Sequence, residues 1–148
     1  MSDRVFASIS IGGHVPLTLR AEFLALIEAE GLRMECDETE FTADRIEPGK
    51  PLDLMAHEVP WGCFDKLERF CLQHRLAYAR SSASCPGSVG AERIVYTGTH
   101  CPLCFDANDN DEVVLTPESV EQLETLEAIL AYFADAAFTI PPLTLGSR

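Results

Sequence analysis

The residues best suited to chemistry are the two cysteines in the segment His100-Cys101-Pro102-Leu103-Cys104. Two thiolates separated by two residues can bind one zinc ion, and the adjacent histidine can add a nitrogen ligand. Structural zinc normally takes four ligands, and the chain has no second pair of cysteines with this spacing. Any further ligand must therefore come from a distant part of the chain.

The expected strand pairing indicates where such a ligand lies. If strands at residues 76–82 and 92–97 pair antiparallel, the end of the second strand lies beside the start of the first. Cys101 then lies near the end of a helix expected at residues 63–75, which carries another cysteine and a histidine one turn apart. The predicted zinc ligands are Cys101, Cys104, His100, Cys71 and His74.

Two other interpretations of the cysteine pair stay open. A redox dithiol needs a thiolate stabilised by a helix N-terminus or a nearby cation, and the acidic residues Asp106 and Asp109 instead raise thiol pKa values. Two loop cysteines without a shared function are the simplest interpretation. Cys85, in the loop of the expected hairpin, should lie at the opposite end from Cys101.

The remaining motif searches favour a protein without catalytic machinery. The run after Asp106 begins like a calcium-binding loop, but its sixth position is Asp111 where glycine is needed, and its twelfth is Pro117 where glutamate is needed. Gly12-Gly13 lacks the spacing of a phosphate-binding loop, and 86–90 lacks the first glycine of a nucleophile elbow. His57 and Glu58 are adjacent in an expected strand and should point to opposite faces.

The charge of the chain is strongly and unevenly negative. The net charge is −13. Residues 1–93 hold 15 acidic and 10 basic groups, a net charge of −5, and residues 94–148 hold 9 acidic and 1 basic, a net charge of −8. Such a field repels nucleic acid and anionic lipid, so neither is an expected partner, whereas a basic protein surface is favoured.

Composition places the chain among globular proteins. The 148 residues, of which 47% are hydrophobic, suffice for one α+β domain over residues 1–148, with 139–148 as an extended tail containing Pro141-Pro142. No apolar run approaches the length that spans a bilayer, and the N-terminus does not resemble a secretory signal. A cytoplasmic protein with reduced cysteines is expected.

Periodicity predicts most of the elements before residue 98. Val5, Ala7, Ile9 and Ile11 alternate with Phe6, Ser8 and Ser10 and predict a strand that ends at Gly12-Gly13. Helices are expected near 16–30 and 63–75. Strands are expected at 32–37, 52–59, 76–82 and 92–97, and a further short strand at 113–115. The order of the first six elements predicts a ferredoxin-like, split βαβ antiparallel sheet with its helices on one face.

One long amphipathic helix is predicted from Thr116 to Phe138. Thr116 is suited to the N-cap and Pro117 to the first helical position. One face carries residues spaced three and four apart, and we expect this stripe to cover the remaining sheet surface. Its members are Leu123, Leu126, Leu130, Phe133 and Ala137.

The other face of this helix is acidic, with no lysine or arginine between Arg93 and Arg148. Surface helices usually mix both signs of charge, so a surface of one sign favours docking onto a basic groove of another protein. The sequence therefore predicts an acidic protein-binding module, in its sharpest form an inhibitor that occupies a basic nucleic-acid-binding surface. A zinc protein centred on Cys101 and Cys104 is the alternative. The predicted partner-binding residues are Glu118, Glu121, Glu124, Asp109 and Asp111.

Overall fold

The centre of the sheet is β1 (Arg4–Val15), which pairs antiparallel with β3 (Leu52–Pro60) and β4 (Ala77–Ser82) in a computed structural model. The structure describes residues 4–84 and 90–146. Ala7, Ile9 and Ile11 are fully buried, whereas the serines between them are half-buried. The alternation predicted for this strand is confirmed, because successive residues of a strand face opposite sides.

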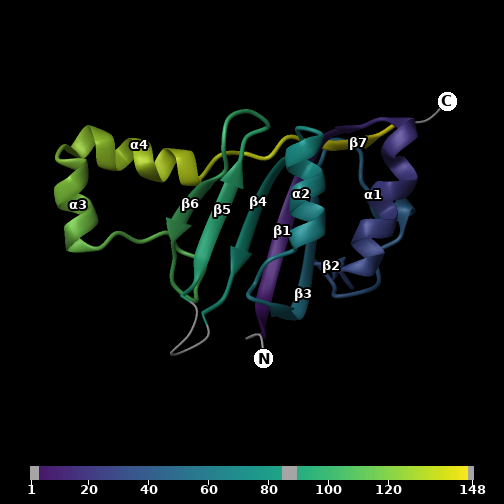
Figure 1. Cartoon of the computed structure of the whole chain (residues 1–148), viewed down its shortest axis with the longest axis horizontal. Helices are drawn as coiled ribbons and strands as arrows, with labels where there is room; N and C mark the ends of the chain where they lie inside the picture. Colours follow the sequence, from purple (N-terminus) through teal and green to yellow (C-terminus); the bar gives the residue numbers. More distant parts are fainter. Residues whose placement is uncertain (1–3, 85–89, 147–148) are drawn as a thin grey trace.

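The molecule is a mixed α+β protein with an antiparallel sheet, as predicted (Figure 1). The six antiparallel strands lie in the order β2-β3-β1-β4-β5-β6, and β7 pairs with the end of β1 in parallel. Two helices, α1 and α2, lie on the same side of this sheet. The bounds of these elements are α1 Leu17–Ala29, β2 Arg33–Met34, α2 Asp65–Gln73, β5 Glu92–Tyr96, β6 Leu103–Asp106 and β7 Leu143–Leu145.

The tail corrects the expected end of β1. Gly12-Gly13 does not stop the strand, which continues to Val15 and pairs with β7. A Cβ atom at Gly12 would lie 1.8 Å from the carbonyl oxygen of Pro141. Gly12 is therefore required by the close approach of two backbone segments that are far apart in the sequence.

The sheet has an apolar cluster on each face. Tyr78 lies among the residues that pack under α1 and α2, whereas its neighbours Ala77 and Ala79 belong to the second cluster. The second cluster also contains Phe105 from β6 and Ile140 from the tail. Since adjacent strand residues face opposite sides, the two clusters lie on opposite faces of the sheet.

The long helix predicted from Thr116 to Phe138 is wrong as a single element. The chain instead forms α3 (Pro117–Leu123) and α4 (Leu126–Ala136), separated by Glu124 with φ of 67°. The side chain of Thr125 accepts a hydrogen bond from the backbone N–H of Ala128 at 3.1 Å and so begins a second helix. The break also removes Glu124 and Glu127 from a shared helix, where like charges three residues apart repel.

The prediction that the leucine stripe covers the sheet is also wrong. Leu126 is 69% exposed and Leu130 is 59% exposed. The side of α4 that packs is centred on Tyr132 and Ala136, and Ala136 is the one buried residue between positions 117 and 136, all of which the structure describes. The tail at Ile140 fills sheet surface that the leucines were expected to cover.

Smaller differences concern element lengths. The strand expected at 32–37 is reduced to β2, and 113–115 forms only an isolated bridge between Ala107 and Val113. Cys104 lies on strand β6 and not in a loop. The hairpin loop that we predicted around Cys85, together with the segment 86–90, falls mostly on residues 85–89, outside the described residues. No helix in the described part of the chain is both long and apolar enough to cross a bilayer.

Candidate functional site

The cysteine pair is split between a loop and a strand. Cys101 is exposed in the loop after β5, and Cys104 is exposed on β6, which forms one edge of the sheet. The loop does approach the end of α2, since a Cβ atom at Gly98 would lie 3.5 Å from the carbonyl oxygen of Arg75. Cys71, however, is fully buried and belongs to the core under the helices. Its side chain faces the core because that side of α2 packs on the sheet.

Cys104 contacts an acidic side chain and no other thiol that the structure describes. Its Sγ donates to Glu92 Oε2 at 3.6 Å. Burial, and then the charge of Glu92, raise the pKa of Cys104, and burial raises the pKa of Cys71 to about 12. Among residues 4–84 and 90–146, no three His, Cys, Asp or Glu side chains are grouped closely enough to hold a metal ion. Zinc binding by the predicted set of Cys101, Cys104, His100, Cys71 and His74 is a question for metal analysis.

The strongest polar network is one that the sequence analysis missed. Arg80 on β4 is 3% exposed and lies on the helix-covered face of the sheet. Its Nε donates to Glu68 Oε1 at 3.0 Å, and its Nη1 donates to the carbonyl oxygen of Gly62 at 2.7 Å. Its Nη2 donates to Glu92 Oε1 at 3.2 Å. Glu68 also accepts from the backbone N–H of Phe64 at 2.7 Å, so one carboxylate holds both α2 and Arg80.

A sequence signal for this network existed in the alternation of β4. Arg80 is two residues after the buried Tyr78 and therefore had to share its face. A buried arginine needs a carboxylate, and Glu68 lies in the first turn of the helix that covers this face. The guanidinium of Arg80 finds its acceptors within the protein. The network is therefore a structural element that joins α2 to the sheet.

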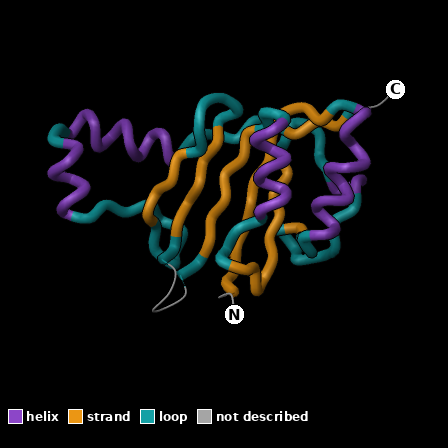
Figure 2. Tube along the Cα trace, in the orientation of Figure 1, coloured by secondary structure: helices purple, strands orange, loops and turns teal. Residues whose placement is uncertain are grey.

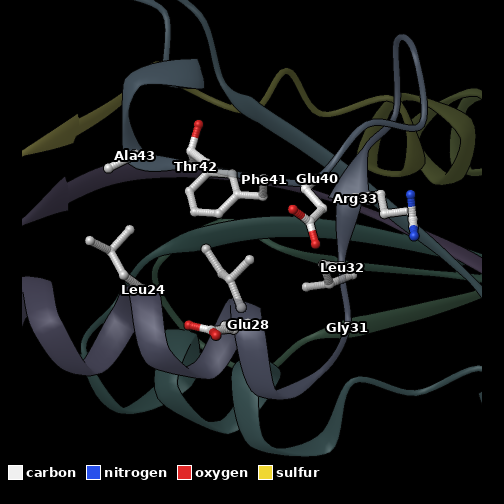
Figure 3. Close-up of a pocket in the computed structure, with 10 residues that line it drawn as sticks. Leu24, Glu28, Gly31, Leu32, Arg33, Glu40, Phe41, Thr42 and Ala43 are labelled. Carbon is white, nitrogen blue, oxygen red and sulfur yellow. The ribbon is translucent and has the colours of Figure 1, made fainter.

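An open depression of about 540 Å³ lies between α1 and the loop at 40–43 (Figure 3). Phe41 and Leu24 provide its apolar part, and the carboxylates of Glu28 and Glu40 extend into it. Arg33 is turned towards the carbonyl oxygen of Glu38, 3.0 Å away. The lining contains no histidine, cysteine or lysine, and the hydroxyl of Thr42 donates to the carboxylate of Asp44.

His57 and Glu58 were expected on opposite faces of a regular strand. A β-bulge in the pairing of β1 with β3 and a φ of 55° at Glu58 interrupt the alternation on which that expectation depends. Both residues lie along an open cavity of about 490 Å³. His57 is nevertheless paired elsewhere, with its Nε2 2.9 Å from Glu38 Oε1, and both of these side chains are mostly exposed. Such an exposed pair contributes little energy and does not form an enclosed acid–base site.

The acidic site is an arm formed by α3 and α4, residues 117–136, which we call the arm. Figure 1 shows α3 and the first part of α4 beyond strand β6, and Figure 2 shows the two helices joined by a short corner. Glu118, Glu121 and Glu124 are exposed on it. None of these three carboxylates takes part in an ion pair among the described residues.

Arg93, the last basic residue before the arm, holds the arm in place through hydrogen bonds. Arg93 Nε donates to the carbonyl oxygen of Ala136 at 2.8 Å, and its Nη1 donates to Ser81 Oγ at 3.1 Å. A cation is favourable at the C-terminal end of a helix, where carbonyl groups lack partners. Phe105 on β6 packs against Tyr132 of α4 with ring centroids 4.9 Å apart. The base of the arm is therefore fixed, while Glu118, Glu121 and Glu124 form no ion pair with any residue that the structure describes.

The other two predicted acidic residues lie apart from these three. Asp109 accepts hydrogen bonds from the backbone N–H and hydroxyl of Ser84 at 2.9 and 2.8 Å, and these bonds lower its pKa. It therefore fixes the loop after β6 against the end of β4. Asp111 lines a shallow depression beside Phe133 at the base of α4. The structure thus divides the predicted partner-binding set between the arm and its base.

The arrangement of the arm suits recognition of a surface, since it offers fixed negative charge and uncovered apolar side chains. The composition of the segment indicated the carboxylates, but its helical pattern predicted buried leucines where Leu126 and Leu130 are exposed. The one signal for the exposed leucines was Thr125, a good N-cap residue within an otherwise helical pattern. No family model, curated protein or solved structure matches this chain.

Proposed function

We propose that this chain is a small acidic protein-binding module whose arm docks onto a basic surface of a protein partner. The observation that carries the proposal is the state of Glu118, Glu121 and Glu124, which are exposed and unpaired among the described residues. Arg93, the nearest preceding cation in the sequence, is occupied by Ala136 and Ser81. A partner with lysines and arginines supplies the missing charge.

In its sharpest form the module is a cytoplasmic inhibitor that occupies a nucleic-acid-binding surface of its partner. Such surfaces carry clustered basic side chains that normally neutralise phosphates. The net charge of −8 over residues 94–148 attracts the same basic clusters. The same charge repels phosphate groups, so this chain does not itself bind nucleic acid. Binding of the arm and binding of nucleic acid to the partner are then mutually exclusive.

We also propose a ferredoxin-like core for the first six elements, extended by β5, β6 and the arm. The order β2-β3-β1-β4, with antiparallel neighbours throughout, supports this assignment. So does the position of α1 and α2 on one face (Figure 1). The arm is then an addition at the far edge of the sheet, where a partner can reach it.

The zinc alternative has no comparable support. Cys71 is enclosed in the core, and no three ligand-type side chains of the described residues lie together. A protein-binding role needs only the surface charge that the arm carries.

The test is affinity capture from the native host with the full chain as bait. Wild-type protein is compared with Glu121→Lys/Glu124→Lys, which reverses the arm, and with Glu22→Lys/Glu28→Lys, which makes the same charge change on exposed positions of α1. We expect one basic protein to be captured by the wild type and by the α1 variant, and to be lost from the arm variant.

Salt and competition complete the test. Because exposed charges are screened by salt, raising NaCl from about 0.1 M to about 0.5 M should release most of the captured protein. For the inhibitor form, the captured protein should lose its binding to nucleic acid when this chain is added. Capture that resists salt, or that survives reversal of Glu121 and Glu124, would contradict the proposed function.

A further inference from the structure

The arm presents an apolar row in addition to its charge. We define the leucine row as Leu126, Leu130, Phe133 and Ala137, which follow one another at spacings of four, three and four residues. Leu126 and Leu130 are 69% and 59% exposed, the two most exposed large apolar side chains among the described residues. This spacing forms one continuous stripe along a helix of about three turns.

Leu126 and Leu130 form the uncovered part of this row, whereas Phe133 is half-buried in the depression that Asp111 also lines. The side of α4 that packs on the protein carries Tyr132 and Ala136, and these contact the second core cluster. The leucine row lies on a neighbouring side of the helix, since positions 126 and 130 differ from 132 and 136 by about a quarter to a half turn. Arg93 and Tyr132 fix the base of α4, so Leu126 and Leu130 are held in place without being buried.

The charges around the row restrict its occupant. Glu121, Glu124 and Glu127 lie near its N-terminal end and are all exposed. Two copies of this chain, each with a net charge of −13, repel one another, which disfavours a homodimer on this row. An anionic membrane is repelled for the same reason. The occupant needs apolar side chains at helical spacing, flanked by lysine or arginine.

We propose that the leucine row is the docking site for a basic amphipathic helix of the partner protein, an inference that rests on the proposed function. Helices that pair side by side bury residues at this spacing and match opposite charges along the edges of the contact. The leucines supply the contact area, and the carboxylates set the orientation and the choice of partner. Recognition therefore has an apolar component that salt does not screen.

The first experiment uses a defined probe with the full-length protein. The probe is a synthetic peptide of about 18 leucine and lysine residues, with the leucines in one helical stripe, and its control has the same composition in scrambled order. Binding is measured by isothermal titration calorimetry at low and high salt. We expect the striped peptide to bind at least about tenfold more tightly than the scrambled one, a difference of about 1.4 kcal/mol.

The second experiment removes the leucines. Leu126→Gln/Leu130→Gln should weaken binding of the striped peptide at least about tenfold, whereas Leu103→Gln, at a 44% exposed leucine of β6 outside the arm, should leave it unchanged. Both substitutions replace exposed side chains, so circular dichroism should report the same fold. Sedimentation velocity of the protein alone should report a monomer.

The outcomes separate this inference from the proposed function. Equal binding of the two peptides, no binding of either, or unchanged binding by Leu126→Gln/Leu130→Gln overturns the leucine row as a docking site. Self-association that the same variant abolishes also overturns it, in favour of a second copy. If the host protein is captured in a charge-dependent way but the leucine variant captures it equally well, the proposed function stands and this inference fails.

Discussion

Removing Arg80 from its buried network should strongly destabilise the protein. Arg80 donates to Glu68, to the carbonyl oxygen of Gly62 and to Glu92 while only 3% exposed. Arg80→Met retains much of the side-chain length but removes the charge and the donors. The carboxylate of Glu68, whose side chain is 12% exposed, then stays buried without its cation.

The magnitude follows from what is left behind. Taking away one partner of a buried ion pair costs about 3–5 kcal/mol, because the other charge is left without compensation. This is a large share of the 5–15 kcal/mol by which a domain is typically stable. Glu92→Gln is the matched control, since the Glu92 side chain is 29% exposed and its loss should cost about 1 kcal/mol or less.

The assay is urea denaturation at neutral pH, followed by far-ultraviolet circular dichroism. Arg80→Met/Glu68→Gln should cost less than the sum of the two single changes, because the double variant leaves no uncompensated charge. A cost below about 1 kcal/mol for Arg80→Met, or additive costs in the double variant, would refute the assignment of Arg80 and Glu68 as a coupled buried pair.

Three further predictions test other parts of the molecule. In urea denaturation, Leu130→Ala should lower the free energy of unfolding by less than about 0.5 kcal/mol, because Leu130 is exposed. Leu54→Ala, in the core, should lower it by about 2–5 kcal/mol. Equal costs would contradict the exposed position of Leu130 on the arm. Burial raises the pKa of Cys71 to about 12, so its thiol should resist a thiol reagent at about pH 8 in the folded protein. The free energy of unfolding should fall as the pH rises above about 8.5, because the thiol ionises there in the unfolded chain but not in the folded protein. Rapid labelling of native Cys71 would count against this. Elemental analysis should find no stoichiometric zinc, and zinc that is lost in Cys101→Ser/Cys104→Ser would restore the metal interpretation.

Some of the candidate site could be predicted from local pattern alone. The carboxylates of the arm follow from a composition without lysine or arginine between Arg93 and Arg148, and the N-cap at Thr116 follows from its side chain. The division of the helix at Glu124 depends on a residue that adopts a φ of 67° with no glycine to indicate it. Thr125 competes locally for the role of N-cap, and this competition decides where α4 begins.

The predicted contribution of Cys71 to a zinc site shows the limit of arguments from strand pairing. The expected approach of the loop after β5 to the end of α2 is present, as the contact of Gly98 with Arg75 indicates. Proximity of backbones does not determine the direction of side chains. Cys71 faces the core because the apolar side of α2 is buried there, and no spacing along the chain could place it beside Cys101.

Periodicity and composition within short segments were sufficient to predict the α+β class, the antiparallel sheet and the acidic surface. Which apolar stripe is buried depends on packing between distant segments of the chain. Ile140 of the returning tail, together with Tyr132 and Ala136, occupies the sheet surface beside Phe105. A sheet face has a limited area, so the leucines of α4 were left outside it, and a helical pattern cannot report which of its sides will find a partner.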